Sequence, residues 1–179
     1  MALTATLHQF TVALSDVDRG VYETLAIKAA RHPSESAEYL WTRVLAYCLE
    51  YADGIAFSRG GLSDPDEPAV LVRDLTGELK AWIEVGLPDA ARLHKAAKAA
   101  PRVAVYMHRE PTPVLRALAE ERIHRASEIE VYAFDRTFIA ALVARLERRL
   151  DLDLSVTDRH LFLTLGSETL EAELRRRAI

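Results

Sequence analysis

The sequence of 179 residues has one cysteine, Cys48, and no long apolar segment. A single cysteine cannot form a disulfide within the chain, and its place in an apolar helical pattern predicts a buried, unreactive side chain. Neither an apolar run of about 18 residues nor a basic stretch followed by an apolar leader occurs. We therefore expect one cytoplasmic domain over residues 1–179, a monomer or weak oligomer without a membrane partner.

An excess of positive charge is also lacking. Lys and Arg total 23 against 27 Asp and Glu, which gives a net charge of −4 at pH 7. Because tight, non-specific nucleic-acid binders usually carry a basic field, any phosphate binding by this chain must be local. The basic clusters within 145–149 and 175–177 stand among glutamates, which predicts exposed helix surfaces rather than a groove.

The motifs of several enzyme classes are missing as well. HExxH, CxxC, GxSxG and P-loop sequences do not occur, and the 6 histidines are scattered without the spacing of metal ligands. These absences disfavour zinc-dependent and serine-dependent hydrolysis.

The stretch 58–98 holds residues that suit a different kind of site. Its apolar runs 69–75 and 79–85 flank Thr76 and Gly77, which predicts a β-hairpin with glycine in the turn. Pairing about this turn places Glu84 opposite residue 68 or 69, beside an acidic cluster. The cluster consists of Asp64, Asp66 and Glu67.

Two interpretations of Glu84 are open. A glutamate inside an apolar run such as 81–85 commonly pairs with an arginine or faces water at a sheet edge, and that explanation is sufficient for an isolated acid. The alternative is a site of two carboxylates. A shift of register by one residue then decides whether Asp66 or Glu67 shares the face of Glu84.

A helix is predicted directly after the hairpin. Pro88 suits a first helical turn, and residues 89–100 are rich in alanine and basic side chains. Helical side chains lean toward the N-terminus, so Lys95 is expected to reach back to the strand end that carries Glu84. The residues expected to contact phosphate are Arg59, Arg92 and His94, although His94 and Lys95 point about a quarter turn apart and cannot both face the site.

These groups suit phosphodiester chemistry. Paired carboxylates bind Mg²⁺ or Mn²⁺, which usually complete their shells with water and substrate phosphate. A metal-bound water can attack a phosphodiester, while a lysine orients that water or stabilises charge on the phosphate oxygens.

The other patterns predict alternating helices and strands, and hence an α/β (α+β) fold with a mixed sheet flanked by helices. Helices are predicted over 17–31, 34–52, 89–100, 111–122 and 135–150. Strands are predicted over 2–14 with a bend, 55–58, 102–107 and 129–134. The segments 152–157 and 160–165 are expected to add a C-terminal β-hairpin, and 167–178 either pairs or trails.

The order of acid, glutamate and lysine resembles the PD-(D/E)XK nuclease superfamily. Pro65 and Asp66 stand where that motif has PD, and 84–86 stands for (D/E)XK, with Gly86 in the place of the lysine. The superfamily sometimes moves this lysine to the following helix, which implies that Lys95 takes its role. It often places another acid on the first core helix, which implies a role for Glu38.

Almost the whole chain is similar to the YaeQ family of bacterial proteins. The resemblance implies a PD-(D/E)XK nuclease-like fold with an αβββαβ core over about residues 34–107. The segments that carry it are 1–3, 30–35, 57–60, 66–68 and 82–89.

Two functions from different classes follow. The first is a divalent-metal-dependent phosphodiesterase or nuclease, in which Asp66 and Glu84 hold Mg or Mn, Glu67 is a further candidate ligand, and Lys95 assists the attacking water. The second is a non-catalytic module on a nuclease-like fold that binds a protein or nucleic acid, and Gly86 in the lysine position motivates it. A component of a transcription or repair complex is a third, weaker hypothesis.

Overall fold

The structure is a computed structural model that describes residues 4–59 and 64–179. The segments 1–3 and 60–63, part of which supported the family resemblance, lie outside the described residues. The strands are β1 (Thr6–Asp16), β2 (Val21–Arg31), β3 (Ile55–Phe57), β4 (Val70–Arg73), β5 (Leu79–Val85), β6 (Arg102–Met107), β7 (Glu130–Ala133), β8 (Arg149–Thr157), β9 (His160–Leu165), β10 (Glu168–Glu173) and β11 (Arg175–Arg177). The helices are α1 (Ala37–Leu49), α2 (Ala90–Ala99), α3 (Thr112–Ala119) and α4 (Arg136–Val143), with a short 3-10 helix, η2 (Ala126–Glu128).

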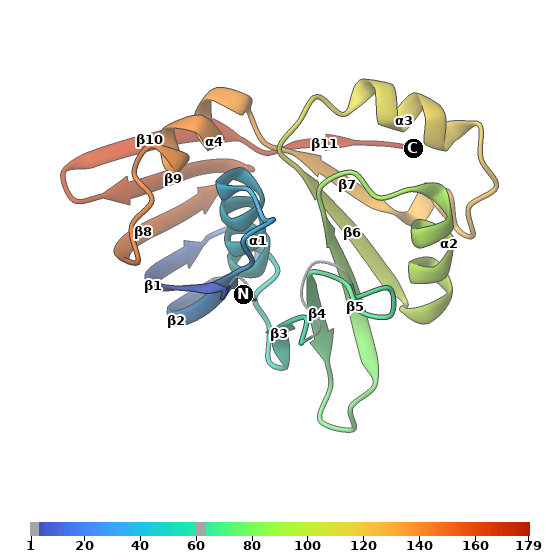
Figure 1. Cartoon of the computed structure of the whole chain (residues 1–179), viewed down its shortest axis with the longest axis horizontal. Helices are drawn as coiled ribbons and strands as arrows, with labels where there is room; N and C mark the ends of the chain where they lie inside the picture. The colour runs from blue at the N-terminus through green and yellow to red at the C-terminus, as the bar shows by residue number, and fades with distance from the viewer. Residues whose placement is uncertain (1–3, 60–63) are drawn as a thin grey trace.

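The described strands form two mixed sheets (Figure 1). One has the order β10-β9-β8-β1-β2, with β1 and β8 parallel. The other has the order β11-β7-β6-β5-β4-β3, with β5, β6 and β7 as parallel neighbours. The predicted mixed α/β fold and the C-terminal hairpin of 152–157 and 160–165 are confirmed, but the expectation of a single sheet is wrong. The hairpin of β8 and β9 pairs with the N-terminal strand β1 and so belongs to a second sheet.

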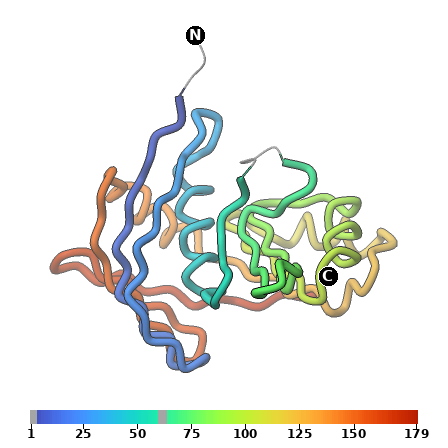
Figure 2. Tube along the Cα trace, turned by 90° about the horizontal axis from the view of Figure 1, so that it is seen from below, coloured from blue at the N-terminus to red at the C-terminus, as the bar shows by residue number. Residues whose placement is uncertain are grey.

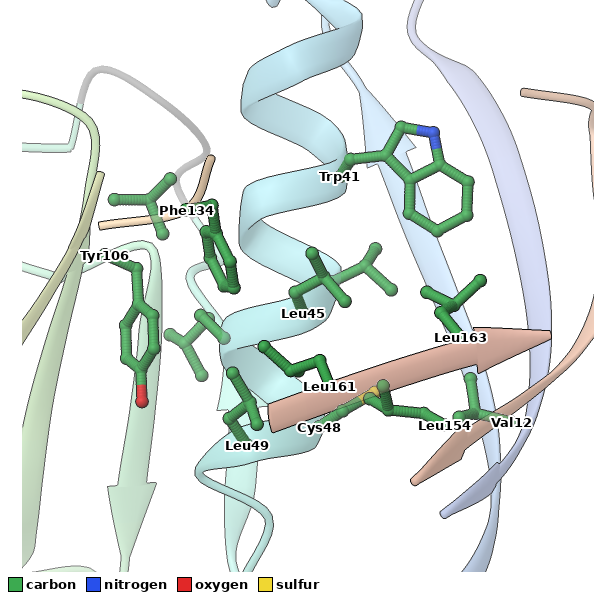
Figure 3. Close-up of a cluster of buried hydrophobic side chains, with 14 of the residues drawn as sticks. Val12, Trp41, Leu45, Cys48, Leu49, Tyr106, Phe134, Leu154, Leu161 and Leu163 are labelled. Carbon is green, nitrogen blue, oxygen red and sulfur yellow. The ribbon is translucent and has the colours of Figure 1, made fainter. Parts of the chain in front are cut away.

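Helix α1 lies between the two sheets, as Figures 1 and 2 show. The Ser36 hydroxyl caps it by accepting a hydrogen bond from the backbone N–H of Tyr39 at 3.1 Å. The predicted burial of Cys48 is confirmed, and it raises the pKa of the thiol to about 12. Figure 3 shows the core around this helix, with Val12, Leu154, Leu161 and Leu163 from one sheet and Tyr106 from the other.

The central part of the chain has the predicted order of elements. It runs α1, β3, β4, β5, α2, β6, and β5 and β6 begin and end where the sequence pattern placed them. In the hairpin, Val70 pairs with Ile83 and Gly77 has a φ of +85°, a value that glycine adopts readily. No helix in the described part of the chain is long and apolar enough to cross a membrane.

The prediction of a helix over 17–31 is wrong, because residues 21–31 form β2. The buried positions Leu25, Ile27 and Ala29 alternate, and β2 pairs with β1 without interruption from Thr6 to Asp16. The helix prediction rested on apolar residues four apart. That spacing fits one face of a strand as well as one face of a helix, so it could not separate the two. The expected bend in the first strand is also absent from β1.

The predicted helix over 135–150 is too long. Helix α4 ends at Val143, and Arg149 already pairs with Gln9 in β1. The arginines of 175–177 likewise form a strand, β11, on the edge of the sheet that contains β7. The expectation that both basic clusters cover helices is therefore wrong. Figure 1 shows the C-terminal chain passing from β10 in one sheet to β11 in the other.

Candidate functional site

A cleft opens at the carboxyl ends of the parallel strands β5 and β6. In open α/β sheets this is the end at which ligands usually bind. One cavity of about 230 Å³ is lined by Tyr39, Ala69, Glu84, Val85, Leu87, Pro88 and Arg92. A second cavity, of about 320 Å³, shares Tyr39, Val85 and Leu87 with the first and continues past Gly86 to His108 and Arg109. The two cavities therefore adjoin.

Glu84 is the buried acid of this cleft, with 4% of its surface exposed. Its Oε1 accepts hydrogen bonds from Trp82 Nε1 and Arg92 Nε, each at 2.6 Å, whereas its Oε2 accepts none from the described residues. Burial raises the pKa of Glu84, although the Trp82 hydrogen bond and the Arg92 charge oppose this shift. One oxygen thus remains available to a ligand.

Arg92 links the strand that carries Glu84 with the acidic segment 64–67. Besides Glu84, its guanidinium donates to the carbonyl oxygens of Asp64, at 3.1 Å, and Glu67, at 2.8 Å. It also lies over the Trp82 ring, 5.8 Å from the centroid. The side chain predicted to contact phosphate therefore bridges β5 and the acidic segment. It takes the contact with Glu84 that the sequence assigned to Lys95.

Lys95 contacts the acidic segment and makes no hydrogen bond or ion pair with Glu84. Its Nζ lies 2.5 Å from Asp66 Oδ1 and 2.8 Å from the Pro65 carbonyl oxygen. The hydrogen bond from Lys95 holds the pKa of Asp66 below its usual value. Lys95 and Arg92 lie one turn apart on α2, so the Lys95–Asp66 pair and the Arg92–Glu84 pair are neighbours on the same helix face.

The Glu67 carboxylate binds Ser58 and the backbone of Arg59. Its Oε2 accepts hydrogen bonds from the Arg59 backbone N–H at 3.1 Å and the Ser58 hydroxyl at 3.4 Å. The observed register of Val70 with Ile83 would place Glu67 on the face of Glu84 if the strand continued. Strand β4 begins only at Val70, so alternation does not extend to the acids. Asp66 is the one that reaches the α2 side.

The other predicted site residues lie further away. His94 Nδ1 accepts a hydrogen bond from the His124 backbone N–H at 3.2 Å, which directs its ring toward the segment after α3. The charge of Glu38 acts to raise the pKa of His108, but Glu38 lines neither cavity. Arg59 is exposed, and its backbone N–H binds Glu67.

Several residues of the cleft were not predicted, among them Glu35, Tyr39 and His108. Glu35 is buried, its pKa is raised by burial, and it pairs with Arg43 at 2.9 Å. Burial raises the pKa of Tyr39 to about 12, so its phenol stays protonated at neutral pH and can donate a hydrogen bond. His108 follows directly after a parallel strand, β6, and this position was the signal that could have identified it.

The surroundings of His108 favour the neutral form of its imidazole. Burial lowers its pKa, the charge of Arg109 adds to this effect, and Glu38 opposes it. Its Nδ1 is buried and has no hydrogen-bond partner among the described residues. The imidazole therefore retains an unused polar atom beside the second cavity.

The donors suit a divalent cation only in part. Glu84 Oε2 is an unused carboxylate oxygen, the type of ligand that Mg²⁺ and Mn²⁺ prefer. Asp66 is ionised and exposed on the α2 side, but its Oδ1 already binds Lys95. Within residues 4–59 and 64–179, no group of three His, Cys, Asp or Glu side chains lies close enough to hold a metal.

Gly86 has a φ of +95°, which explains why lysine is absent from this position. A Cβ atom there would lie 3.6 Å from the Tyr39 ring, an ordinary contact, so the cost of a side chain comes from the backbone. Gly86→Lys is expected to lower the free energy of unfolding by about 1–2 kcal/mol. Urea denaturation should show a similar loss for Gly86→Ala. A Gly86→Lys protein as stable as the wild type would contradict this explanation.

Comparison with known proteins gives matches over almost the full length. The sequence model of the YaeQ protein family matches residues 1–174. Uncharacterized protein YaeQ of Escherichia coli (strain K12) is 32% identical over 176 residues, which cover 97% of this chain and 96% of that protein. The crystal structure of YaeQ protein from Pseudomonas syringae has a TM-score of 0.87 and 30% identity, covering 98% of this chain and 97% of that one. The YaeQ structure from Xanthomonas axonopodis pv. citri has a TM-score of 0.87 and 29% identity, covering 98% and 99%.

Proposed function

The chain belongs to the YaeQ family, and from the chemistry of its cleft we propose that it is a divalent-metal-dependent phosphodiesterase of the PD-(D/E)XK nuclease class. The observation that carries the proposal is Glu84, a buried carboxylate at the end of a parallel strand, one oxygen of which accepts no hydrogen bond from the described residues. The pair of Asp66 and Lys95 beside it supports the same chemistry. The order α1, β3, β4, β5, α2, β6 is compatible with the nuclease core.

Different residues of the cleft would bind the metal, orient a water and bind the phosphate. A Mg²⁺ or Mn²⁺ ion held by Glu84 Oε2 and Asp66 would supply a bound water of lowered pKa. Lys95, which lies on Asp66, would orient a water or neutralise phosphate charge. The protonated phenol of Tyr39 would donate a hydrogen bond to a phosphate oxygen.

Titration of metal-free protein with Mn²⁺ by calorimetry tests this proposal. We expect stoichiometric binding by the wild type and a loss of about tenfold or more in affinity, 1.4 kcal/mol, for Glu84→Gln. Glu171→Gln, an exposed glutamate of β10, is the matched control and should bind like the wild type. Binding that Glu84→Gln leaves unchanged would contradict the proposed site. So would a wild type that neither binds Mn²⁺ nor cleaves labelled oligonucleotides in its presence.

The same titration should depend on pH. Burial raises the pKa of Glu84, so a proton competes with the metal at a pH above 4.5, the ordinary value for glutamate. Mn²⁺ affinity is therefore expected to fall as the pH is lowered, beginning before 4.5 is reached. Asp66 does not cause this fall, because its pKa is lowered. An affinity that stays constant down to pH 4.5 would rule out Glu84 as the titrating ligand.

A non-catalytic binding module is the second candidate. It is favoured by Arg92, which neutralises Glu84, and by Lys95, which contacts Asp66 and Pro65. In such a module the cleft would bind a protein or nucleic acid without cleaving it. Binding of an oligonucleotide that proceeds without Mn²⁺ and without cleavage would favour this candidate over the phosphodiesterase.

A further inference from the structure

Four arginines gather at the far end of the cleft and form what we call the arginine surface. They are Arg109, Arg136, Arg175 and Arg177, and they line a cavity of about 180 Å³ together with Glu110 and Asp135. They come from three separate parts of the chain. Arg109 follows β6, Arg136 begins α4, and the other two lie on β11, which pairs with β7 at the edge of the sheet (Figure 1).

Most of these guanidinium groups have no hydrogen-bond or salt-bridge partner among the described residues. Among the described residues, Arg109, Arg136 and Arg177 make no hydrogen bond or salt bridge through their side chains, and all four arginines are exposed. Arg175 has one partner, Glu173 at 3.4 Å, and both side chains are more than half exposed. By contrast, Arg92, which stabilises the fold, donates hydrogen bonds to Glu84 and to two backbone carbonyl oxygens.

The two acids of this cavity each bind the start of the following helix through one carboxylate oxygen. The Glu110 carboxylate accepts hydrogen bonds from the backbone N–H and hydroxyl of Thr112, and these bonds lower its pKa. The Asp135 carboxylate caps α4 through the backbone N–H groups of Thr137 and Phe138, and its pKa is lowered too. Four cations thus face two carboxylates that are bound to their own helix starts. The result is a local positive patch on a protein of net charge −4.

The arginine surface is continuous with the candidate site. Arg109 lines both the 180 Å³ cavity and the 320 Å³ cavity, and the latter shares Tyr39, Val85 and Leu87 with the cavity at Glu84. β5, β6 and β7 are parallel neighbours, so this path crosses their carboxyl ends in order. We call this row of three neighbouring cavities, from the buried carboxylate at one end to the four arginines at the other, the groove.

We propose that the arginine surface binds backbone phosphates of a single-stranded nucleic acid that lies along this groove with another phosphate at Glu84. Exposed guanidinium groups without partners suit phosphate, which they bind in a bidentate manner. Tyr39 and His108 line the cavity between the two ends, and aromatic side chains are the type on which unstacked bases stack. A duplex would need a broad basic face, whereas these arginines gather around one cavity of about 180 Å³. The placement of the second phosphate rests on the proposed function, whereas strand binding by the arginines does not.

Fluorescence anisotropy with a fluorescein-labelled oligothymidylate, in EDTA, tests the inference. The double variant Arg136→Glu/Arg177→Glu is expected to bind about tenfold or more weakly, because two phosphate contacts are lost. The slope of log affinity against log salt should become shallower by about 1.4 for single-stranded DNA. Arg148→Glu/Arg149→Glu is the matched control, because it makes the same change of net charge on exposed residues outside the groove. It should bind like the wild type.

Several results would overturn the inference. These are equal losses in both double variants, tighter binding of duplex than of single strand, and no binding of the oligonucleotide by the wild type. Failure of the phosphodiesterase proposal looks different, because Mn²⁺ binding would be absent while strand binding still depended on Arg136 and Arg177. The two double variants should retain the Mn²⁺ binding of the wild type, since neither changes the groups around Glu84.

Discussion

Replacing Arg92 with alanine is expected to lower the free energy of unfolding by about 3–5 kcal/mol. The reason is that Glu84, whose side chain is 5% exposed, would lose its only cationic partner among the described residues while remaining buried. The carbonyl oxygens of Asp64 and Glu67 would lose their hydrogen bonds at the same time. Urea denaturation of the two proteins at neutral pH measures the difference.

A double variant separates the two contributions. In Arg92→Ala/Glu84→Gln no buried charge is left unpaired, so part of the lost stability should return. Arg92→Lys should remain destabilised, because an ammonium group cannot reproduce the fork that binds Glu84 and two carbonyl oxygens. If Arg92→Ala proved as stable as the wild type, the contact would be a surface ion pair of little value, contrary to its burial.

Arg102→Ala is the second change with a large expected effect, a loss of about 3 kcal/mol. Arg102 binds both carboxylate oxygens of Glu50 and of Glu130 at the end of the sheet opposite the cleft. Glu50 is 6% exposed and also accepts a hydrogen bond from the Tyr106 hydroxyl at 2.7 Å. Without the guanidinium, that carboxylate would stay buried with one neutral donor. Urea denaturation again provides the measurement.

The loss should be smaller in Arg102→Ala/Glu50→Gln, in which the buried charge is removed together with its partner. The pH dependence gives an independent check. Burial raises the pKa of Glu130, but hydrogen bonds from Arg102 and Tyr132 outweigh this and leave the pKa lowered. At pH values above 4.5, the ordinary pKa of a glutamate, the lowered pKa of Glu130 contributes to the stability of the fold. This contribution is lost as the pH falls through the folded-state pKa of Glu130. Arg102→Ala should lose less stability on acidification than the wild type, and an equal loss would contradict this role.

The sequence predicted the segments that form the candidate site but not the contacts between its side chains. Local patterns identified the strand that carries Glu84, the following helix and the acidic segment, and the structure makes the Lys95–Asp66 and Arg92–Glu84 pairs neighbours on one helix face. The pairing within that set was not predictable. Arg92 and Lys95 lie on the same side of α2, and burial decides between them, because only a guanidinium can satisfy Glu84 and two carbonyl oxygens together.

The arginine surface illustrates what no local pattern contains. Arg109, Arg136 and the arginines of β11 are far apart in the sequence, and the last group reads as a basic run among glutamates. They converge because β11 pairs with β7, a strand more than forty residues earlier, next to β6. Neither the groove nor its positive charge could be inferred before that pairing was known.

The elements whose signals are short-range could be predicted from the sequence: the hairpin around Gly77, the helix after Pro88, and the strands β5 and β6. Turn residues, helix propensity and alternation act within a few neighbours, so they can be recognised without the fold. The tertiary structure alone decided that residues 21–31 form a strand and that β8 lies beside β1. Those outcomes depend on which apolar faces can be buried against one another across long separations, and this is a property of the whole chain.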